Sequence, residues 1–218
     1  IHFFLEIIKC CGGEWINKNE EVTLTTPEVI NATKWLKELL TSGASPLSVT
    51  NFSETEALQT FESGEAALMR NWPYAWAELQ KETSSVKGKV GVTTMVSQEG
   101  YNSTATLGSW GFSILKNSKN KKASYKVIEF LTSEKSQKKL FLQNGYTPTS
   151  SKLYKDPELI QKSTILPQLE KALSIAKPRP QTPLYAQISD VLQLQVSSIL
   201  TGHNKVEDSL ILANNKTE

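Results

Sequence analysis

The stretch from residue 61 to residue 76 constrains the fold most, because a short apolar run ends there in aromatic rings broken by a proline. The run 66–69 follows Gly64 and has the length of a strand in the interior of a sheet. Pro73 can stand in the first turn of a helix, since it lacks only an N–H group that has no partner there. The stretch therefore predicts a strand followed directly by a helix.

Three aromatic side chains lie at this predicted junction: Trp72, Tyr74 and Trp76. Open α/β sheets bind their ligands at the carboxyl ends of strands, where such junctions lie. The alternative for any one of these rings is packing in the core, which is the commoner use of large aromatic residues. We favour core packing for Trp76.

The composition is that of a globular protein, with 39% apolar and 21% charged residues in 218, enough for one large or two small domains. The formal net charge of +2 does not suggest a nucleic-acid partner. Between Lys116 and Lys139 there are eight lysines against two glutamates. Lysines without interleaved arginines are more typical of a solvated helix surface than of a nucleic-acid or membrane site.

No residue set indicates a metal, a cofactor or a catalytic site. His2 and His203 are far apart, and the adjacent Cys10 and Cys11 suggest two buried or half-buried thiols.

The one close acid pair considered for catalysis is Glu54 and Glu56. Residues two apart on a helix point about 200° away from each other, so these carboxylates cannot flank one glycosidic bond. Acids also complement the dipole at a helix start, which is the better interpretation here.

Helical periodicity and capping residues place the remaining elements. Gly12 and Gly13 end an apolar first helix, and Thr26 begins a helix that Gly43 closes and that should pack on a sheet. Further helices are expected after 51–56 and before Gly64, and at 75–82, 120–131, 133–143, 166–176, 185–200 and 206–213; further strands are expected at 88–93 and 107–115.

Residues 1–8 are apolar with one glutamate, without an initiator Met, a charged leading region or a cleavage site. They fit neither a signal peptide nor a membrane span. We expect the chain to be a fragment whose natural N-terminal part, with any targeting signal, lies outside this sequence.

The stretch 61–76, with its Gly-Glu-Ala-Ala-Leu-Met and Asn-Trp-Pro-Tyr, resembles the central motif of extracellular solute-binding proteins of sugar ABC importers, the maltose/trehalose-binding type. Other segments resemble the same family in the same order along the chain. They are Gly12-Gly13, a Thr-Pro-Glu helix start, Leu107-Gly-Ser-Trp-Gly, Gly145-Tyr-Thr-Pro-Thr, Lys155-Asp-Pro-Glu, Arg179-Pro, Leu200-Thr-Gly and a terminal Val-Glu-Asp-Ser-Leu.

The resemblance implies an α/β fold of the periplasmic-binding-protein type II, with two lobes that close on a ligand. Residues 1–107 and 157–218 would belong to the C-terminal lobe, and residues 108–156 would cross over and pack in the N-terminal lobe. Most of the N-terminal lobe would be absent from this sequence.

The resemblance also implies the ligand-binding residues. Trp72 and Tyr74 would stack on a sugar, residues 108–110 (Gly108, Ser109 and Trp110) would line the cleft, and Arg179 would donate to hydroxyls. Arg179 lies between two prolines, so less entropy remains to be lost when its guanidinium binds a ligand oxygen. Two positions depart from the family pattern: Cys10-Cys11, where polar or small residues are usual, and Ser109, where a second glycine is frequent.

The function implied is a non-catalytic sugar-binding component of an ABC importer, monomeric at full length. It would deliver a sugar from monosaccharide to oligosaccharide, such as maltose or trehalose, to membrane permease subunits. Its place would be periplasmic or extracellular, lipid-anchored in a Gram-positive-type cell. The alternatives are a fragment of a glycan-processing enzyme and an interaction module that uses the lysine-rich face.

Overall fold

The computed structural model describes all residues from 1 to 218, and the chain divides into two compact units. Unit 1 contains Ile1–Phe52, Thr94–Leu107 and Ala172–Glu218, and unit 2 contains Ser53–Thr93 and Gly108–Lys171. Residues 53–93 therefore group with residues 108–171, whereas the sequence assigned residues 108–156 of that range to the other lobe. The lobe assignment itself stays a prediction.

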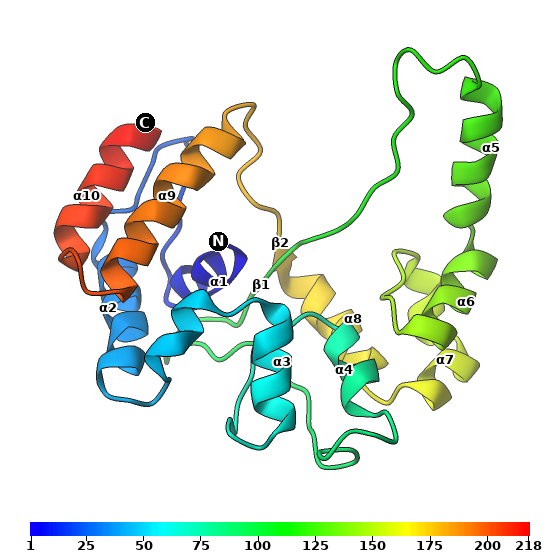
Figure 1. The fold of residues 1–218 in the computed structure, drawn as a ribbon. Helices are drawn as coiled ribbons and strands as arrows, with labels where there is room; N and C mark the ends of the chain where they lie inside the picture. Colours follow the sequence, from blue (N-terminus) through cyan, green and yellow to red (C-terminus); the bar gives the residue numbers. More distant parts are fainter. The chain divides into compact units, whose positions relative to one another are not determined.

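Unit 1 is built mainly from helices (Figure 1). Cys11 caps the first helix and Gly12 follows with φ of 84°, a conformation that glycine adopts without steric cost. The elements of unit 1 are α1 (His2–Cys10), α2 (Pro27–Thr41), the 3-10 helix η1 (Leu47–Asn51), β1 (Ala105–Thr106), β2 (Ala176–Lys177), α9 (Tyr185–Leu200) and α10 (Val206–Thr217).

The core of unit 1 joins the first two helices of the chain to its last two. Helix α9 buries a stripe of apolar side chains against α2 and α10, and α1 is buried along most of its length. The buried apolar residues are Phe4, Leu5, Ile7, Ile8, Trp15, Leu24, Val29, Ala32, Leu36, Ile188, Leu192, Val196, Ile199, Val206, Leu210 and Ala213. Burial of this size supplies the main driving force for folding of the unit.

The two strands form a short parallel ladder, with Ala105 opposite Ala176 and Thr106 opposite Lys177. The ladder is tied to α1, because the buried carboxylate of Glu6 accepts a hydrogen bond from the Thr106 N–H at 3.0 Å. A buried backbone N–H needs such a partner, so Glu6 supplies what a third strand would otherwise provide.

Unit 2 consists of short helices with well-formed starts. Ser53 and Glu56 form a capping box at α3, Ser133 caps α6 and Asp156 caps α7, each satisfying backbone N–H groups of the first turn. The elements are α3 (Glu54–Glu62), α4 (Tyr74–Leu79), α5 (Lys121–Leu131), α6 (Glu134–Asn144), η2 (Ser151–Lys155) and α7 (Pro157–Lys162). Helix α8 (Leu166–Ile175) runs from unit 2 into unit 1.

Two separate apolar clusters stabilise unit 2. One gathers the end of α6, η2, α7 and the start of α8, and it comprises Phe141, Leu153, Tyr154, Leu159, Ile165, Leu166 and Leu169. The other joins α3 to α4 through Leu58, Ala75 and Leu79. Helix α5 buries none of its residues, and Figure 1 shows it after a long stretch without regular structure.

The helices predicted from the sequence are confirmed, and α9 has the predicted bounds. The predicted strands at 66–69, 88–93 and 107–115 are wrong, because these segments are irregular and form no ladder. A strand needs a neighbour to pair its N–H and C=O groups. The Leu107 N–H donates to the Lys177 carbonyl at 2.9 Å, but no ladder continues from there, and the other two segments form none. Packing of α2 on a sheet is also wrong: α2 contacts α1, α9 and α10.

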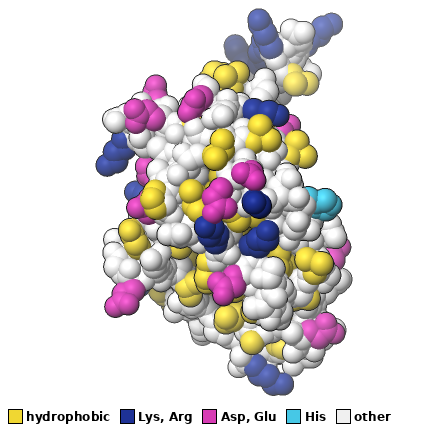
Figure 2. Space-filling view, turned by 90° about the vertical axis from the view of Figure 1, so that its left-hand side faces the viewer, with side chains coloured by type: hydrophobic (Ala, Val, Ile, Leu, Met, Phe, Trp, Pro, Cys, Tyr) yellow, Lys and Arg dark blue, Asp and Glu magenta, His cyan; other side chains and the backbone are white.

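On most of the face shown in Figure 2, acidic, basic and hydrophobic side chains are interspersed, and Lys and Arg side chains gather at its upper edge. None of the helices is long and apolar enough to cross a membrane.

Candidate ligand-binding cleft

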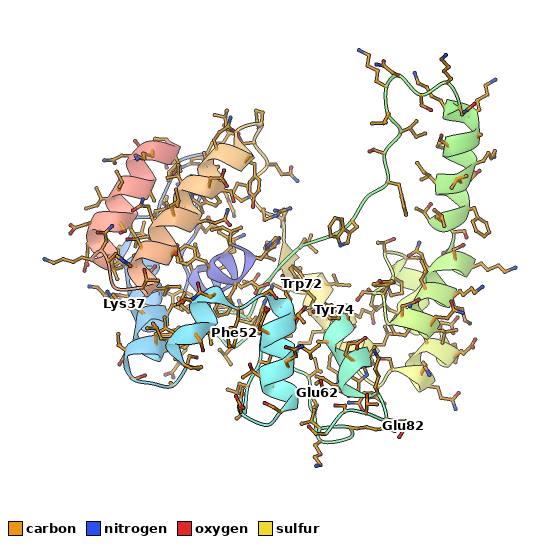
Figure 3. All side chains as sticks on the ribbon, viewed as in Figure 1. Lys37, Phe52, Glu62, Trp72, Tyr74 and Glu82 are labelled. Atoms are coloured by element: carbon orange, nitrogen blue, oxygen red, sulfur yellow. The ribbon has the colours of Figure 1, made fainter.

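Pro73 sets the position of the predicted stacking residues. It has φ of −56° and ψ of −24° and stands directly before α4, so Tyr74 is the first residue of the helix. This confirms the helix start at the proline. Figure 3 shows Trp72 and Tyr74 at this entry to α4.

The Trp72 ring is held by neighbours from α3 and from its own segment. Its indole N–H donates to Oε1 of Glu54 at 3.0 Å, and the guanidinium carbon of Arg70 lies 4.6 Å from the ring centroid. The Asn71 amide donates to the Glu54 carbonyl at 3.0 Å, which fixes the same turn. Glu54 and Glu56 thus act at a helix start, as predicted, with Glu56 in the capping box.

A cleft of about 890 Å³ lies within unit 2, beside α4. One wall comes from Pro73, Tyr74 and Trp76, and the others come from residues 141–146 at the end of α6 and residues 162–165 before α8. Volumes of this size are typical of small-molecule sites. Trp72 is not among the lining residues, whereas Trp76 lines the cleft and also packs, half-buried, against Phe141 and its neighbours.

The polar lining offers both donors and acceptors. The Gln80 Oε1 accepts from the Gly88 N–H at 3.3 Å, but its Nε2 is buried and has no hydrogen-bond partner. A buried donor without a partner costs free energy in the protein without ligand. Glu78 is paired with Lys81 in an ion pair at the same wall.

Tyr74 presents a neutral phenol at physiological pH. Burial is the main cause that raises its pKa above the ordinary value, and the carboxylates of Glu54 and Glu78 raise it further. A neutral hydroxyl can both donate and accept, which suits a ligand rich in hydroxyl groups.

The other predicted site residues lie elsewhere. Gly108, Ser109 and Trp110 are exposed in the irregular stretch before α5, and the Trp110 side chain is 102% exposed. None of the three lines the cleft. In unit 2, the structure therefore brings Tyr74 to the cleft but not the predicted loop 108–110.

Arg179 belongs to unit 1, in the loop after β2. Its Nη1 donates to the Tyr185 hydroxyl at 3.1 Å, and its guanidinium carbon lies 4.8 Å from the Tyr185 ring centroid. Tyr185 in turn packs near Trp15, with ring centroids 6.4 Å apart. The predicted ligand donor is thus held by an aromatic ring as well as by its flanking prolines.

Sequence reasoning missed several residues of the cleft, among them Gln80, Asn144 and Tyr146. The only signal was Gly145, which the pattern marked as a turn. Gly145 has φ of 71°, and a Cβ built there would lie 2.6 Å from the Ala77 Cβ. This close approach is what brings the end of α6 against α4.

No group of three or more His, Cys, Asp or Glu side chains is placed to hold a metal ion. Cys10 is a buried thiol and Cys11 a half-buried one, as predicted.

Comparison with known proteins identifies the family. The family model described as bacterial extracellular solute-binding protein matches residues 1–138. A probable ABC transporter-binding protein of Deinococcus radiodurans is 34% identical over 193 residues, which cover 87% of this chain and 46% of that protein. The chain spans about half the length of the curated relatives that it matches.

Solved structures agree with this assignment. Maltose-bound MalE3 of T. maritima is 34% identical and superposes with a TM-score of 0.95, over 99% of this chain and 56% of that one. A solute-binding protein of Agrobacterium radiobacter K84 in complex with ribitol, 24% identical, has the same fold with a TM-score of 0.85, over 98% and 55%. The predicted periplasmic-binding-protein fold and the resemblance to sugar importers are confirmed. The chain belongs to the bacterial extracellular solute-binding protein family.

Proposed function

We propose that the protein is the sugar-binding component of an ABC importer and that the cleft beside α4 is part of its sugar site. The observation that carries this proposal is the lining of the cleft, where the Tyr74 and Trp76 side chains share a wall with the polar side chain of Gln80. The sequence identity of 34% to a maltose-bound protein supports the same ligand class.

The chemistry of a sugar fits such a lining. A pyranose has an apolar C–H face that packs well on an aromatic ring, and its hydroxyls need directed donors and acceptors. The cleft offers rings on one wall, and the amide side chains of Gln143 and Asn144 are among its polar lining residues. We propose a sugar from monosaccharide to oligosaccharide, with maltose and trehalose as the first candidates.

The ligand-binding set that we propose is Trp72, Tyr74, Gly108, Ser109, Trp110 and Arg179. Tyr74 stacks on the sugar and Trp72 supports the same wall, while Arg179 donates to sugar hydroxyls. Residues 108–110 (Gly108, Ser109 and Trp110) line the cleft of the closed protein. Sugar bound to groups from two lobes shifts the population toward the closed form.

The whole protein then delivers the sugar, unaltered, to permease subunits in the membrane. The family is one of solute-binding proteins rather than of enzymes, and the acid pair Glu54 and Glu56 serves the start of α3. We propose a monomer outside the cytoplasmic membrane, periplasmic or held at the cell surface by a lipid anchor.

Calorimetric titration of the whole protein with maltose, trehalose, sucrose and glucose tests the proposal. The variant Tyr74→Ala should weaken binding of the preferred sugar roughly five- to tenfold, the effect of about 1–1.5 kcal/mol of stacking. Tyr125→Ala is the matched control, because Tyr125 is 60% exposed on α5 and does not line the cleft.

Two results would contradict the proposal. If the protein binds a sugar saturably but Tyr74→Ala and Tyr125→Ala change the affinity equally, the cleft beside α4 is not the sugar site. Recovery of shorter sugars from the titration mixture would identify an enzyme instead.

A further inference from the structure

A smaller cavity lies in unit 1 and has two cysteines in its wall. It measures about 260 Å³ and lies between the end of α1, the middle of α2 and the segment 96–98. Cys10 and Cys11 both line it, and the apolar side chains of Ile7, Ala32, Trp35 and Val96 form much of the remaining wall. Neither cysteine belongs to the proposed sugar site.

The backbone around the two thiols is firmly held. The Gln98 N–H donates to the Cys10 carbonyl at 3.0 Å, and the Tyr101 N–H donates to the Gln98 carbonyl at 3.0 Å. The Tyr101 ring packs directly on Gly12, where a Cβ would lie 2.1 Å from a ring carbon. The cysteines therefore sit at a fixed helix end rather than on a mobile loop.

Both thiols are protonated at neutral pH. Burial raises the pKa of Cys10 and of Cys11 above the ordinary value, and a backbone hydrogen bond at Thr104 lowers that of Cys10 only in part. The pair thus enters any reaction as two neutral S–H groups in a largely apolar cavity.

Two features limit which metal or metalloid group can bind here: the cavity offers only two sulfur ligands, and its wall is largely apolar. A structural zinc ion needs four ligands, and no third Cys, His, Asp or Glu stands in a group with these thiols. A charged complex would be costly to bury in such a cavity. The bound group should therefore have a thiophilic atom that forms bonds to two sulfurs and leaves the complex neutral. It should also carry an apolar substituent that fills the cavity.

We propose that Cys10 and Cys11 form a ligand site for a trivalent organoarsenical, whose arsenic bridges the two sulfurs while its organic group packs against Trp35. With an aryl arsenoxide, two S–H bonds and the arsenic–oxygen bond break and two arsenic–sulfur bonds form. The two protons leave with the oxygen as one water, and no electrons are transferred. An apolar cavity of about 150 Å³ holds a benzene molecule, so an aryl group fits the volume here.

Phenylarsine oxide is the probe, and the measurements are intact mass and the melting temperature of the protein. We expect one adduct per chain, reversed by 2,3-dimercaptopropanol but not by an equal thiol concentration of 2-mercaptoethanol. The melting temperature should rise, because a ligand that prefers the folded chain stabilises it. Adjacent cysteines in an unfolded chain also react with phenylarsine oxide. A higher melting temperature therefore requires that the folded cavity binds the probe more tightly than the unfolded chain does.

Four variants sharpen the test. Cys10→Ala and Cys11→Ser should each abolish the dithiol-selective adduct. Trp35→Leu keeps both thiols and should weaken binding at least threefold, whereas Trp110→Leu, a change at an exposed residue outside the cavity, should leave binding unchanged.

Several outcomes would overturn the proposal. They are an adduct that forms only in urea, a melting temperature that falls on binding, and equal affinity of the Trp35→Leu variant and the wild-type protein. The melting temperature and the Trp35→Leu result do not depend on whether the cysteine variants fold.

Discussion

Glu6 and Thr106 are joined by a hydrogen bond from the Thr106 N–H to the Glu6 carboxylate, 3.0 Å long and buried at both ends. Through it, the first helix holds the short ladder of β1 and β2. Glu6→Leu should lower the free energy of unfolding by about 1–3 kcal/mol, because the buried N–H loses its acceptor. Glu6→Gln keeps an acceptor oxygen and should cost less. Urea denaturation compares the two, and equal losses would show that the bond does not matter.

The core of unit 1 depends on Leu192, which is fully buried on α9. Leu192→Ala should destabilise the protein by about 2–5 kcal/mol through lost burial and the cavity left behind. Leu194→Ala is the control, since Leu194 lies on the same helix but is 68% exposed. Thermal unfolding followed by circular dichroism measures both, and a similar loss for the two variants would contradict the assigned core.

Gly145 is expected to be irreplaceable for two separate reasons. Alanine there meets the unfavourable φ of 71° and also the Ala77 Cβ at 2.6 Å. Gly88 has the same φ, but a Cβ added there meets nothing within 4 Å. Gly88→Ala should therefore cost about 1–2 kcal/mol of backbone strain, and Gly145→Ala clearly more. Equal free energies of unfolding for the two variants would show that α4 shifts to accommodate the added methyl group without cost.

Alkaline pH should destabilise the apolar cluster of unit 2 that contains Tyr154. Burial is the main cause that raises the pKa of Tyr154 to about 12, and its hydroxyl donates to the Pro148 carbonyl at 2.7 Å. The folded state favours the neutral phenol, so its contribution is complete below the ordinary pKa of about 10 and is lost as pH rises toward 12. Tyr154→Phe should lower stability at pH 7 by about 1 kcal/mol and make it less dependent on pH between 10 and 12. Denaturation at a series of pH values checks this, and an unchanged slope in the variant would refute it.

Tyr185 is expected to act on sugar binding through Arg179. The contact of its ring with the guanidinium is worth about 0.5–1 kcal/mol, so Tyr185→Leu should weaken the proposed sugar binding about two- to fivefold. Tyr185→Phe keeps the ring and should retain most of the affinity. If both substitutions leave the affinity unchanged, Arg179 is either not a sugar ligand or not held by Tyr185.

The sequence predicted helices well because their signals are local. The α9 stripe of Ile188, Leu192 and Val196 and the stop at Gly202 lie within one continuous segment, and the bounds of α9 follow from them. Strands failed because pairing is not local. Residues 66–69 look like a buried strand, but without a partner the Leu68 side chain is 90% exposed.

The cleft was predicted only in part for the same reason. Tyr74 was identified because Pro73 marks the helix start beside it, which is a signal between neighbouring residues. Gln80 and Tyr146 come together through the contact of Gly145 with Ala77, and nothing in the sequence pairs those two positions. The hydrogen bond from Arg179 to the Tyr185 hydroxyl likewise depends on the path of the loop between the two residues, which the sequence does not reveal.

The joining of the first helices to the last in the core of unit 1 has a consequence for how the protein forms. Helix α2 packs against α9 and α10, which are made later in synthesis, whereas α1 packs against α2 and β1. Contacts between distant segments cost loop-closure entropy before they stabilise anything, and they slow folding. Until synthesis reaches α9 and α10, the apolar face of α2 that packs on them stays uncovered, and exposed apolar surface of this kind favours aggregation.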